Sequence, residues 1–487
     1  DFDEEPLPFD SYIRLEKSLL LHQSIIQKKL AKLTEKAMAK VLRQYIKAEI
    51  PKFVRLDKKN SLFIPGQSSV PVSGKVLGEA DLEYLVDASL DGWLTTGRFN
   101  AEFEQKLADF LNVKHVLTTN SGSSANLLAI AALSSETLGS RALKTGDEVI
   151  TVAAGFPTTV NPILQYGLVP VFIDITLPSY NIDVTQIESA ITNKTKAIML
   201  AHTLGNPFNI QVVTQLARKH NLWLIEDCCD ALGTLYTPTI DLQDTQGKTI
   251  PANSLRHVGT FGDIATLSFY PAHHITMGEG GALFTNNAKL KLIIESFRDW
   301  GRDCFCPPGH DNTCKKRYCY QRGELPAGYD HKYTYSHVGY NLKITDMQAA
   351  VGVAQLEKLP TFIQARKENY AKLRQGLETL QEYLILPEAT ENADVSWFGF
   401  PITLIQHERS QFIAFLDQKK IASRLLFGGN LTKQPYFKDQ HYRIVNELEN
   451  TDKVMNNTLW LGVYPGLDEA MIDYMMTSIK EFFIGNK

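Results

Sequence analysis

The chain has 487 residues, of which 44% are hydrophobic and 21% charged, a globular composition that excludes wholesale disorder. Its 50 basic and 54 acidic residues give a formal net charge of −4, and no long basic run suggests nucleic-acid binding. No run of 18 apolar residues occurs, so no membrane span is expected. Residues 1–5 (Asp-Phe-Asp-Glu-Glu) do not resemble a secretory signal, and we expect a cytoplasmic protein.

The predicted elements begin with a helix over residues 10–50, where apolar residues recur at close to 3.6-residue spacing. From about 75 to 350, short apolar runs alternate with helical segments. Strands are predicted at 148–153, 168–174, 196–202, 221–226, 264–270 and 281–285, and helices at 123–133, 158–166 and 210–220. This alternation predicts an α/β fold with a mostly parallel sheet covered on both faces. The polar run at 235–257 predicts a surface insertion between two core strands.

The rest of the chain predicts a second, smaller α/β unit. A long helix is expected at about 345–380, and the segments after it are a strand at 397–405 and helices at 409–419 and 467–483. We therefore divide the chain into three parts. They are an N-terminal helical extension (1–60), a large domain (61–350) and a small C-terminal domain (351–487).

Two segments have the features of a ligand site. Residues 119–126 (Thr-Asn-Ser-Gly-Ser-Ser-Ala-Asn) follow a strand and open a helix, so small residues and free N–H groups could receive a phosphate, although such helix starts are common without one. Residues 224–230 (Leu-Ile-Glu-Asp-Cys-Cys-Asp) end a strand in acidic residues, at the sheet edge where ligands bind. A buried carboxylate there needs a partner such as a protonated pyridine nitrogen. The alternative is an aspartate that caps the following helix.

All six cysteines lie between Cys228 and Cys319, and four of them fall within 304–319. Six are too few for a disulfide scaffold in a chain of this length. Clustered cysteines instead indicate a metal site or redox chemistry. From the residues alone, a zinc site and an iron–sulfur site are equally good interpretations.

A third segment, 266–281 (Thr-Leu-Ser-Phe-Tyr-Pro-Ala-His-His-Ile-Thr-Met-Gly-Glu-Gly-Gly), resembles a known family. Together with the two segments above, it makes residues 70–485 similar to the sugar aminotransferases of the DegT/DnrJ/EryC1/StrS family. Residues 92–99, 339–348 and 434–437 also fit that family. The resemblance implies the aspartate-aminotransferase fold (fold type I of the pyridoxal phosphate enzymes), with a mostly parallel sheet in the large domain.

The chain departs from the family's aminotransferases at one position. They carry Ser-Phe-x-Pro-x-Lys, whose lysine binds the coenzyme covalently, whereas this chain has His273 there and no lysine between Lys248 and Lys289. An imidazole cannot form that covalent imine. The resemblance therefore implies pyridoxamine 5′-phosphate (PMP) held non-covalently, with His273 as the base that takes a proton from the coenzyme's methylene carbon.

Residues 268–281 resemble, more narrowly, the iron–sulfur 3-dehydrase branch of the family, which acts on CDP-4-keto-6-deoxyglucose. In that branch a distant cysteine, a Cys-x-Cys pair and a cysteine after seven further residues hold a 2Fe–2S cluster. The matching residues here are Cys229, Cys304, Cys306 and Cys314, with the cluster loop at 303–320. If its strand stays extended, Cys229 faces the same side as Asp227, and Cys228 faces away. Cys228 and Cys319 are expected outside the ligand set, although either could replace a member.

The resemblance assigns the remaining site residues by position. Ser123 and Ser268 hold the coenzyme phosphate, with Gly122 allowing its close approach, Phe156 stacks on the pyridine ring, and Asp227 holds the ring nitrogen. Asn341 matches a residue that reaches the phosphate of the neighbouring subunit, which implies a homodimer. The cofactor and sugar pocket is further lined by Asp230, Tyr270 and Phe398.

The resemblance thus implies a lyase/oxidoreductase that uses PMP and a 2Fe–2S cluster to deoxygenate C3 of a nucleotide-linked 4-keto-6-deoxyhexose. The product belongs to 3,6-dideoxysugar biosynthesis, as in lipopolysaccharide O-antigen, and a flavin/iron–sulfur NAD(P)H reductase would supply the electrons. The nucleotide, CDP or dTDP, and the hexose configuration stay open. One alternative is a cluster-free 3-dehydratase or aminotransferase of the same fold. The other is a non-catalytic regulator with a structural zinc.

Overall fold

The computed structural model describes residues 35–57, 62–244, 247–306, 309–310, 312–319 and 321–485. The chain forms two compact units, 1–60 and 61–487. In the first unit, α2 (Glu35–Asp57) is a single helix with Pro51 inside it. The part of the expected N-terminal helix before residue 35 lies outside the described residues.

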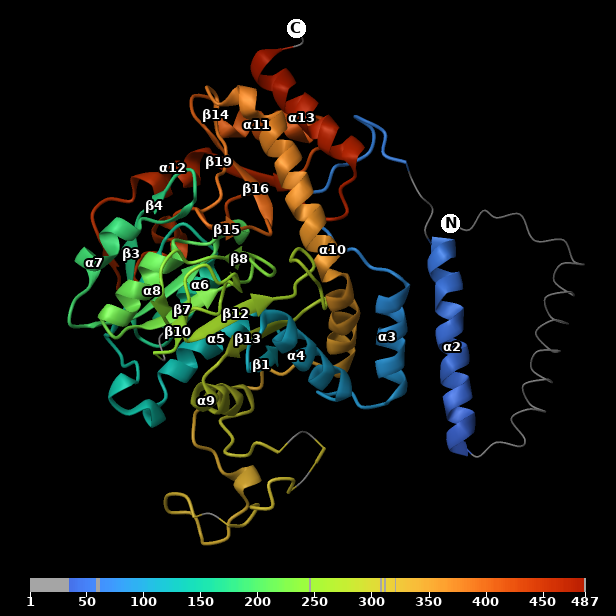
Figure 1. Ribbon diagram of the computed structural model, residues 1–487, viewed down its shortest axis with the longest axis vertical. Helices are drawn as coiled ribbons and strands as arrows, with labels where there is room; N and C mark the ends of the chain where they lie inside the picture. The colour runs from blue at the N-terminus through green and yellow to red at the C-terminus, as the bar shows by residue number, and fades with distance from the viewer. Residues whose placement is uncertain are drawn as a thin grey trace, which may run out of the picture. The chain divides into compact units, whose positions relative to one another are not determined.

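The second unit is built around an eight-stranded sheet in the order β1-β13-β12-β7-β6-β2-β3-β18 (Figure 1). Its strands are β1 (His115–Thr119), β2 (Glu148–Val152), β3 (Val169–Ile173), β6 (Thr195–Ala201), β7 (Trp223–Asp227), β12 (Ile264–Ser268), β13 (Gly281–Thr285) and β18 (Arg443–Ile444). All neighbours from β12 to β18 pair in parallel, and only β13 pairs antiparallel, with β1 and with β12. The mostly parallel sheet is therefore confirmed.

Helices cover both faces of this sheet, because alternate residues of its central strands enter two different cores. In β6, Ile198 and Leu200 pack in a core with α4 (Arg98–Leu111) and α8 (Ile210–Lys219). Ala197 and Met199 pack instead in a core with helices on the other side. Those helices are α5 (Gly122–Leu133) and α9 (Ala288–Arg298). Strands buried on both faces read as continuous apolar runs, which is the pattern the sequence shows.

Further short elements complete the large domain. They are α3 (Glu79–Leu90), α6 (Pro157–Gln165), α7 (Ile187–Ala190) and the β4–β5 pair (Ile175–Thr176 with Asn181–Ile182). The predicted insertion lies between β7 and β12 and forms β8 (Leu235–Tyr236), β9 (Leu242–Gln243), β10 (Thr249–Ile250) and β11 (Arg256–His257). Its Tyr236, Leu242 and Ile250 are buried in the same core as Ile198. The insertion is thus anchored in the core by apolar residues, which its mostly polar composition did not predict.

The helix α10 (Asp346–Gly376) connects two cores. Thr345 caps its first turn by accepting a hydrogen bond from the Gln348 backbone N–H, while the Gln348 side chain accepts one from Thr345. Val353 and Leu359 lie in the core of the large sheet, and Leu373 lies in a second core. One helix thus belongs to both parts of the unit.

The second core is formed around a four-stranded antiparallel sheet, β14-β16-β19-β17. Its elements are β14 (Leu384–Ile385), β16 (Gly399–Leu404), β17 (Arg424–Leu425), β19 (Thr458–Gly462), α11 (Arg409–Gln418), α12 (Glu449–Asn457) and α13 (Glu469–Ile484), while β15 (Ala393–Asp394) pairs with β8. The short strand β18 returns to the large sheet beside β3. The predicted domain boundary at 350/351 therefore falls inside one helix and inside one compact unit.

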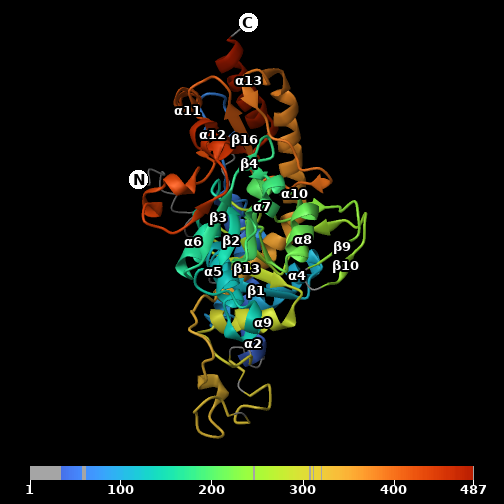
Figure 2. The same cartoon turned by 90° about the vertical axis from the view of Figure 1, so that its left-hand side faces the viewer.

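The segment between α9 and α10 contains the cysteine loop, which we define as residues 302–335. Backbone bridges join Asp299 to Asn341 and Arg302 to Tyr335 at its base. Both views show this segment projecting beyond α9 (Figures 1 and 2). In the described residues, no helix is long and apolar enough to cross a membrane.

Candidate active site

A cavity of about 900 Å³ opens at the carboxyl ends of β6, β7 and β12, with the strands of the small sheet on its far side. Ten of the predicted site residues line it: Gly122, Ser123, Phe156, Asp227, Cys229, Asp230, Ser268, Tyr270, His273 and Phe398. Asn341 and the three cysteines of the loop are not among the described residues that line it. A cavity of this size suits a cofactor together with a substrate.

The start of α5 forms one end of the cavity. Ser121 caps the helix by accepting a hydrogen bond from the Ser124 backbone N–H at 3.1 Å, and Ser123 is exposed. A Cβ atom on Gly122 would lie 2.5 Å from the Cβ of Ser268 and 3.0 Å from Sγ of Cys229. Only glycine fits between these side chains. A helix N-terminus with small residues can receive a phosphate, which is the role that the sequence analysis expects here.

Asp227, at the end of β7, is a buried carboxylate held by neutral donors. It accepts hydrogen bonds from Asn126 Nδ2 at 2.8 Å, from Thr159 Oγ1 at 2.7 Å and from the Cys229 backbone N–H at 3.1 Å. Thr266 Oγ1 lies 3.4 Å from its other oxygen and donates to Asn126 Oδ1 at 2.7 Å. A carboxylate oriented in this way suits a cationic group in the cavity, such as a protonated pyridine nitrogen.

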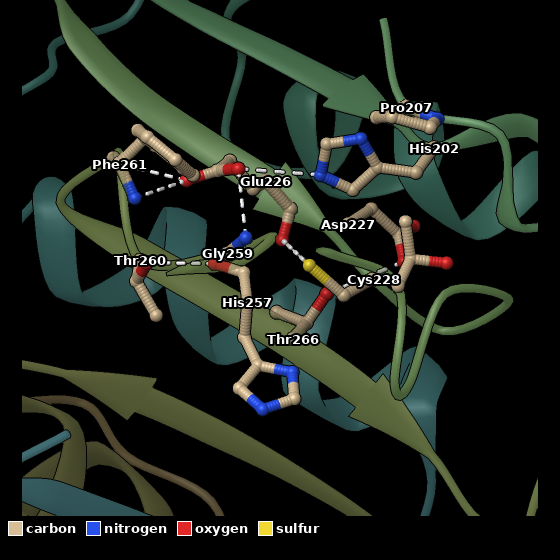
Figure 3. A network of polar contacts seen from close by, with 12 residues as sticks. His202, Pro207, Glu226, Asp227, Cys228, His257, Gly259, Thr260, Phe261 and Thr266 are labelled. Carbon is tan, nitrogen blue, oxygen red and sulfur yellow. Dashed lines mark hydrogen bonds and ion pairs between the residues drawn. The ribbon is translucent and has the colours of Figure 1, made fainter. Parts of the chain in front are cut away.

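The neighbouring residues of β7 face the opposite way. Glu226 accepts hydrogen bonds from the backbone N–H groups of Gly259, Phe261 and Gly262, and its carboxylate lies 3.2 Å from His202 Nε2 (Figure 3). Cys228 is buried in the core. The predicted alternation is confirmed, since Asp227 and Cys229 line the cavity whereas Cys228 does not.

His273 and Asp230 form a pair in the cavity wall. His273 Nδ1 lies 3.5 Å from Asp230 Oδ1, and the His273 ring packs 5.2 Å from that of Phe398. Burial, and then the positive charge of Arg366, lower the pKa of His273 to about 4. Burial, and then the negative charge of Asp227, raise the pKa of Asp230 to about 8. At neutral pH the imidazole is therefore uncharged and can accept a proton.

Arg366 is a site residue that the sequence reasoning missed. It is fully buried on α10 and donates to the carbonyls of Trp397 at 3.2 Å, Phe398 at 3.1 Å and His273 at 3.2 Å. It thereby ties the backbone at His273 to the backbone at Trp397 and Phe398. The available signal was its position four residues after Phe362, on the face of α10 that also carries the apolar residues Leu359 and Leu373.

The cysteine loop brings three of the four predicted metal ligands near a histidine. Sγ of Cys304, Sγ of Cys306 and a ring nitrogen of His331 lie within 4.8 Å of one another. His331 Nε2 is 3.9 Å from Cys304 Sγ and 3.5 Å from Cys314 Sγ. Although burial alone would raise it, hydrogen bonds from Thr313 and Cys314 lower the pKa of Cys306 to about 6. A thiolate is the form that binds metal, so this group fits a thiophilic metal centre.

The structure does not bring every predicted ligand to this group. Cys229 lines the cavity at the end of β7 and is not part of the Cys304–Cys306–His331 cluster within the described chain. Cys319 is exposed on the loop. Asn341 is exposed at the base of the loop, where it accepts a hydrogen bond from Lys343 Nζ at 2.8 Å. His331 was missed because one histidine after a long loop gives no spacing signal.

A model of the DegT/DnrJ/EryC1/StrS aminotransferase family matches residues 75–480. The chain belongs to this family. It is 60% identical to the lipopolysaccharide biosynthesis protein RfbH of Salmonella typhimurium, over 91% of this chain and 98% of RfbH. It is 49% identical to the dTDP-4-dehydro-2,6-dideoxy-D-glucose 3-dehydratase of Saccharopolyspora spinosa, over 88% of this chain and 89% of that enzyme.

Solved structures of the family agree with the fold. The GDP-4-keto-6-deoxy-D-mannose-3-dehydratase of E. coli with bound hydrated pyridoxal phosphate superposes with a TM-score of 0.72 at 27% identity, covering 84% of this chain and 99% of that one. The predicted aspartate-aminotransferase-like fold is therefore confirmed. The chain is an enzyme of this family of pyridoxal phosphate-dependent sugar 3-dehydratases and aminotransferases.

Proposed function

We propose that this enzyme removes the C3 hydroxyl of a nucleotide-linked 4-keto-6-deoxyhexose in 3,6-dideoxysugar biosynthesis, with PMP and a 2Fe–2S cluster as cofactors. The observation that carries the proposal is His273, which lines the cavity at the position where the family's aminotransferases have lysine. The similarity to a 3-dehydratase supports dehydration, and the name of RfbH supports a role in lipopolysaccharide synthesis.

The cavity fits the coenzyme at both ends. Ser123 opens α5 and Ser268 lies beside that helix start to bind its phosphate, and Asp227, which accepts a hydrogen bond from Asn126 of α5, lines the same cavity to bind its ring nitrogen. The Phe156 ring is half exposed beside the cavity, where it can stack on the pyridine. When bound, PMP supplies the amine that condenses with the sugar's keto group and a ring that accepts electrons while the C3 hydroxyl leaves.

His273 acts as the proton acceptor. Its imidazole is neutral at pH 7 and takes the methylene proton of the coenzyme, while Nδ1 faces the carboxyl of Asp230. Arg366 holds the His273 backbone carbonyl and so keeps the ring in position. Asp230, Tyr270 and Phe398 line the space beside His273, and we assign them to the sugar.

The C3 deoxygenation also needs a reductant. Replacing C–OH by C–H consumes two electrons and two protons and releases one water. A 2Fe–2S cluster held by Cys229, Cys304, Cys306 and Cys314 supplies single-electron transfer when bound. A separate flavin/iron–sulfur NAD(P)H reductase would provide the electrons, and the working unit is a homodimer. We place the reaction in the cytoplasm.

The experiment separates dehydration from reduction with Cys304→Ser. This variant should lose the cluster, still exchange the coenzyme's methylene proton with deuterated solvent when substrate is present, and form no 3-deoxy product with NADH and the reductase. Cys319→Ser is the matched control, because Cys319 is an exposed loop cysteine outside the Cys304–Cys306–His331 group, and it should keep both activities.

Mass spectrometry of the coenzyme follows the exchange after circular dichroism has shown a folded protein, because metal loss can unfold a site. A folded, cluster-free variant that binds PMP and substrate without exchange would place the cluster in the dehydration step. Zinc without iron in anaerobically purified wild type would overturn the cluster. An amino sugar as the product would make the enzyme an aminotransferase.

A further inference from the structure

Cys229 has a fixed position in the wall of the cavity. It follows β7, which lies in the middle of the large sheet between β6 and β12. Its backbone N–H donates to Asp227 Oδ1 at 3.1 Å, and its Sγ would lie 3.0 Å from a Cβ on Gly122. These contacts hold the Cys229 backbone at the end of β7, with its thiol close to the start of α5. Any metal that Cys229 binds must therefore lie at the wall of the cavity.

The loop cysteines are held elsewhere in the same chain. The Asp303 backbone N–H donates to the Thr334 carbonyl at 2.9 Å, and that of His331 donates to the Arg317 carbonyl at 3.0 Å. Arg317 also forms an ion pair with Asp330 at 2.7 Å. These contacts fold the loop on itself beyond α9 (Figures 1 and 2). In the described structure, the thiols on the loop and the thiol in the cavity belong to separate groups.

The loop and its base carry many exposed apolar side chains. They are Trp300, Phe305, Tyr318, Tyr329, Tyr333, Tyr335 and Val338, of which Val338 is 93% exposed. Aromatic residues are enriched at protein interfaces, and a surface this apolar indicates a docking surface. The cavity wall likewise has half-exposed Phe156 and Tyr270. The apolar side chains of the loop belong to none of the hydrophobic cores of the described protomer.

We infer that the cluster is shared between two copies of this chain: Cys229 of one protomer and Cys304, Cys306 and Cys314 of the other bind the same 2Fe–2S unit. This inference rests on the proposed function. A second copy is the occupant because the two incomplete parts, three thiols on the loop and one in the cavity, sum to the four that a cluster needs.

His331 defines the competing arrangement. In a tetrahedral site with metal–sulfur bonds of about 2.3 Å and metal–nitrogen bonds of about 2.05 Å, sulfur and nitrogen ligands lie roughly 3.6 Å apart. The observed distances from His331 Nε2 to Cys304 and Cys314, 3.9 and 3.5 Å, are close to this value. The loop could therefore form a closed site without Cys229, and the test must distinguish the two.

Complementation between two variants provides the test. Cys229→Ser and Cys304→Ser are co-expressed with different affinity tags, and the heterodimer is isolated anaerobically. If the ligands come from two protomers, one of its two sites is intact, so it should contain about half the iron and half the visible absorbance of wild type. Each parent homodimer should contain neither. A heterodimer of Cys304→Ser with Cys306→Ser, both changed in the loop, is the matched control and should contain none.

The outcomes are decisive in both directions. A Cys229→Ser plus Cys304→Ser heterodimer without iron would overturn sharing, because ligands from one chain leave both sites damaged. Full iron in the Cys229→Ser homodimer would also overturn it and assign the fourth ligand to His331. Wild type without iron would instead contradict the proposed function itself.

Disulfide cross-linking provides a second test if the variants of the heterodimer experiment do not fold. In the cluster-free chain that retains only Cys229 and Cys306, oxidation by diamide removes one hydrogen from each thiol and joins the sulfurs. Ligands on different protomers give a covalent dimer on a non-reducing gel. A disulfide within the monomer would refute the arrangement.

Discussion

Replacing Asp230 by asparagine should stabilise the coenzyme-free protein at neutral pH. The Asp230 side chain is 15% exposed and lies 3.5 Å from the uncharged imidazole of His273. Burial and the nearby charge of Asp227 raise the pKa of Asp230 from 3.8 to about 8. The folded protein thus keeps a proton that the unfolded chain releases at pH 7, and this difference disfavours folding.

The size and sign of the effect on stability follow from the shift in the pKa of Asp230. Each pKa unit corresponds to about 1.4 kcal/mol, and pH 7 lies roughly three units above the ordinary pKa, so the penalty is about 4 kcal/mol. It is absent near pH 4, grows as the pH rises, and levels off above pH 8. The Asp230→Asn variant has no such penalty, because its amide does not titrate. At roughly 2.1 cal/mol/K per residue, the melting temperature at pH 7 should rise by about 4 °C.

The assay is thermal unfolding of wild type and Asp230→Asn, free of coenzyme, at several pH values from 4 to 8. Asp183→Asn is the matched control. Its carboxylate accepts hydrogen bonds from Thr185 and Gln186, and these lower its pKa although partial burial opposes them, so its loss should destabilise at pH 7. A difference between wild type and Asp230→Asn that is independent of pH would show that Asp230 is ionised in the folded protein.

Three other substitutions test the site. His273→Asn should retain PMP and sugar binding but lose about 10²–10⁴-fold in C3–O cleavage, and turnover within about threefold of wild type would disprove its role as base. Gly122→Ala places a Cβ 2.5 Å from that of Ser268, so the dissociation constant for PMP, measured by titration, should rise at least roughly tenfold, and an unchanged constant would contradict the steric argument. Arg366→Met leaves three carbonyls without their donor, so the free energy of unfolding measured with denaturant should fall by about 3 kcal/mol. An unchanged free energy of unfolding would show that these hydrogen bonds do not stabilise the fold.

The local pattern of the sequence was enough for much of the fold. Strands such as β2 and β6 are short apolar runs, and helices such as α5 and α8 begin at recognisable N-cap residues. The alternation of these strands and helices along the chain predicted a mostly parallel sheet. The period of two along β7 correctly placed Asp227 and Cys229 on one side and Cys228 on the other. The motif order indicated the family and marked His273 as the departure from it.

Pairings between distant segments needed the tertiary structure. Asp230 and His273 lie on different strand ends, and Arg366 comes from a helix that the cavity motifs do not include. Asn126 and Thr159 meet at Asp227 only because α5 and α6 both start at the same edge of the sheet. The periodicity of the sequence does not predict such contacts between distant residues, since they depend on the order of the strands and on the path of the chain between them.

The cysteines show this limit most clearly. The resemblance to the family implied one set of four, and spacing along the chain carries no information about where a loop lies in the fold. The fold leaves Cys229 at the end of β7, takes the other three beyond α9, and adds His331 to them. Sequence determined which residues can bind a metal, whereas the route of residues 299–341 decides which of them can meet within one protomer.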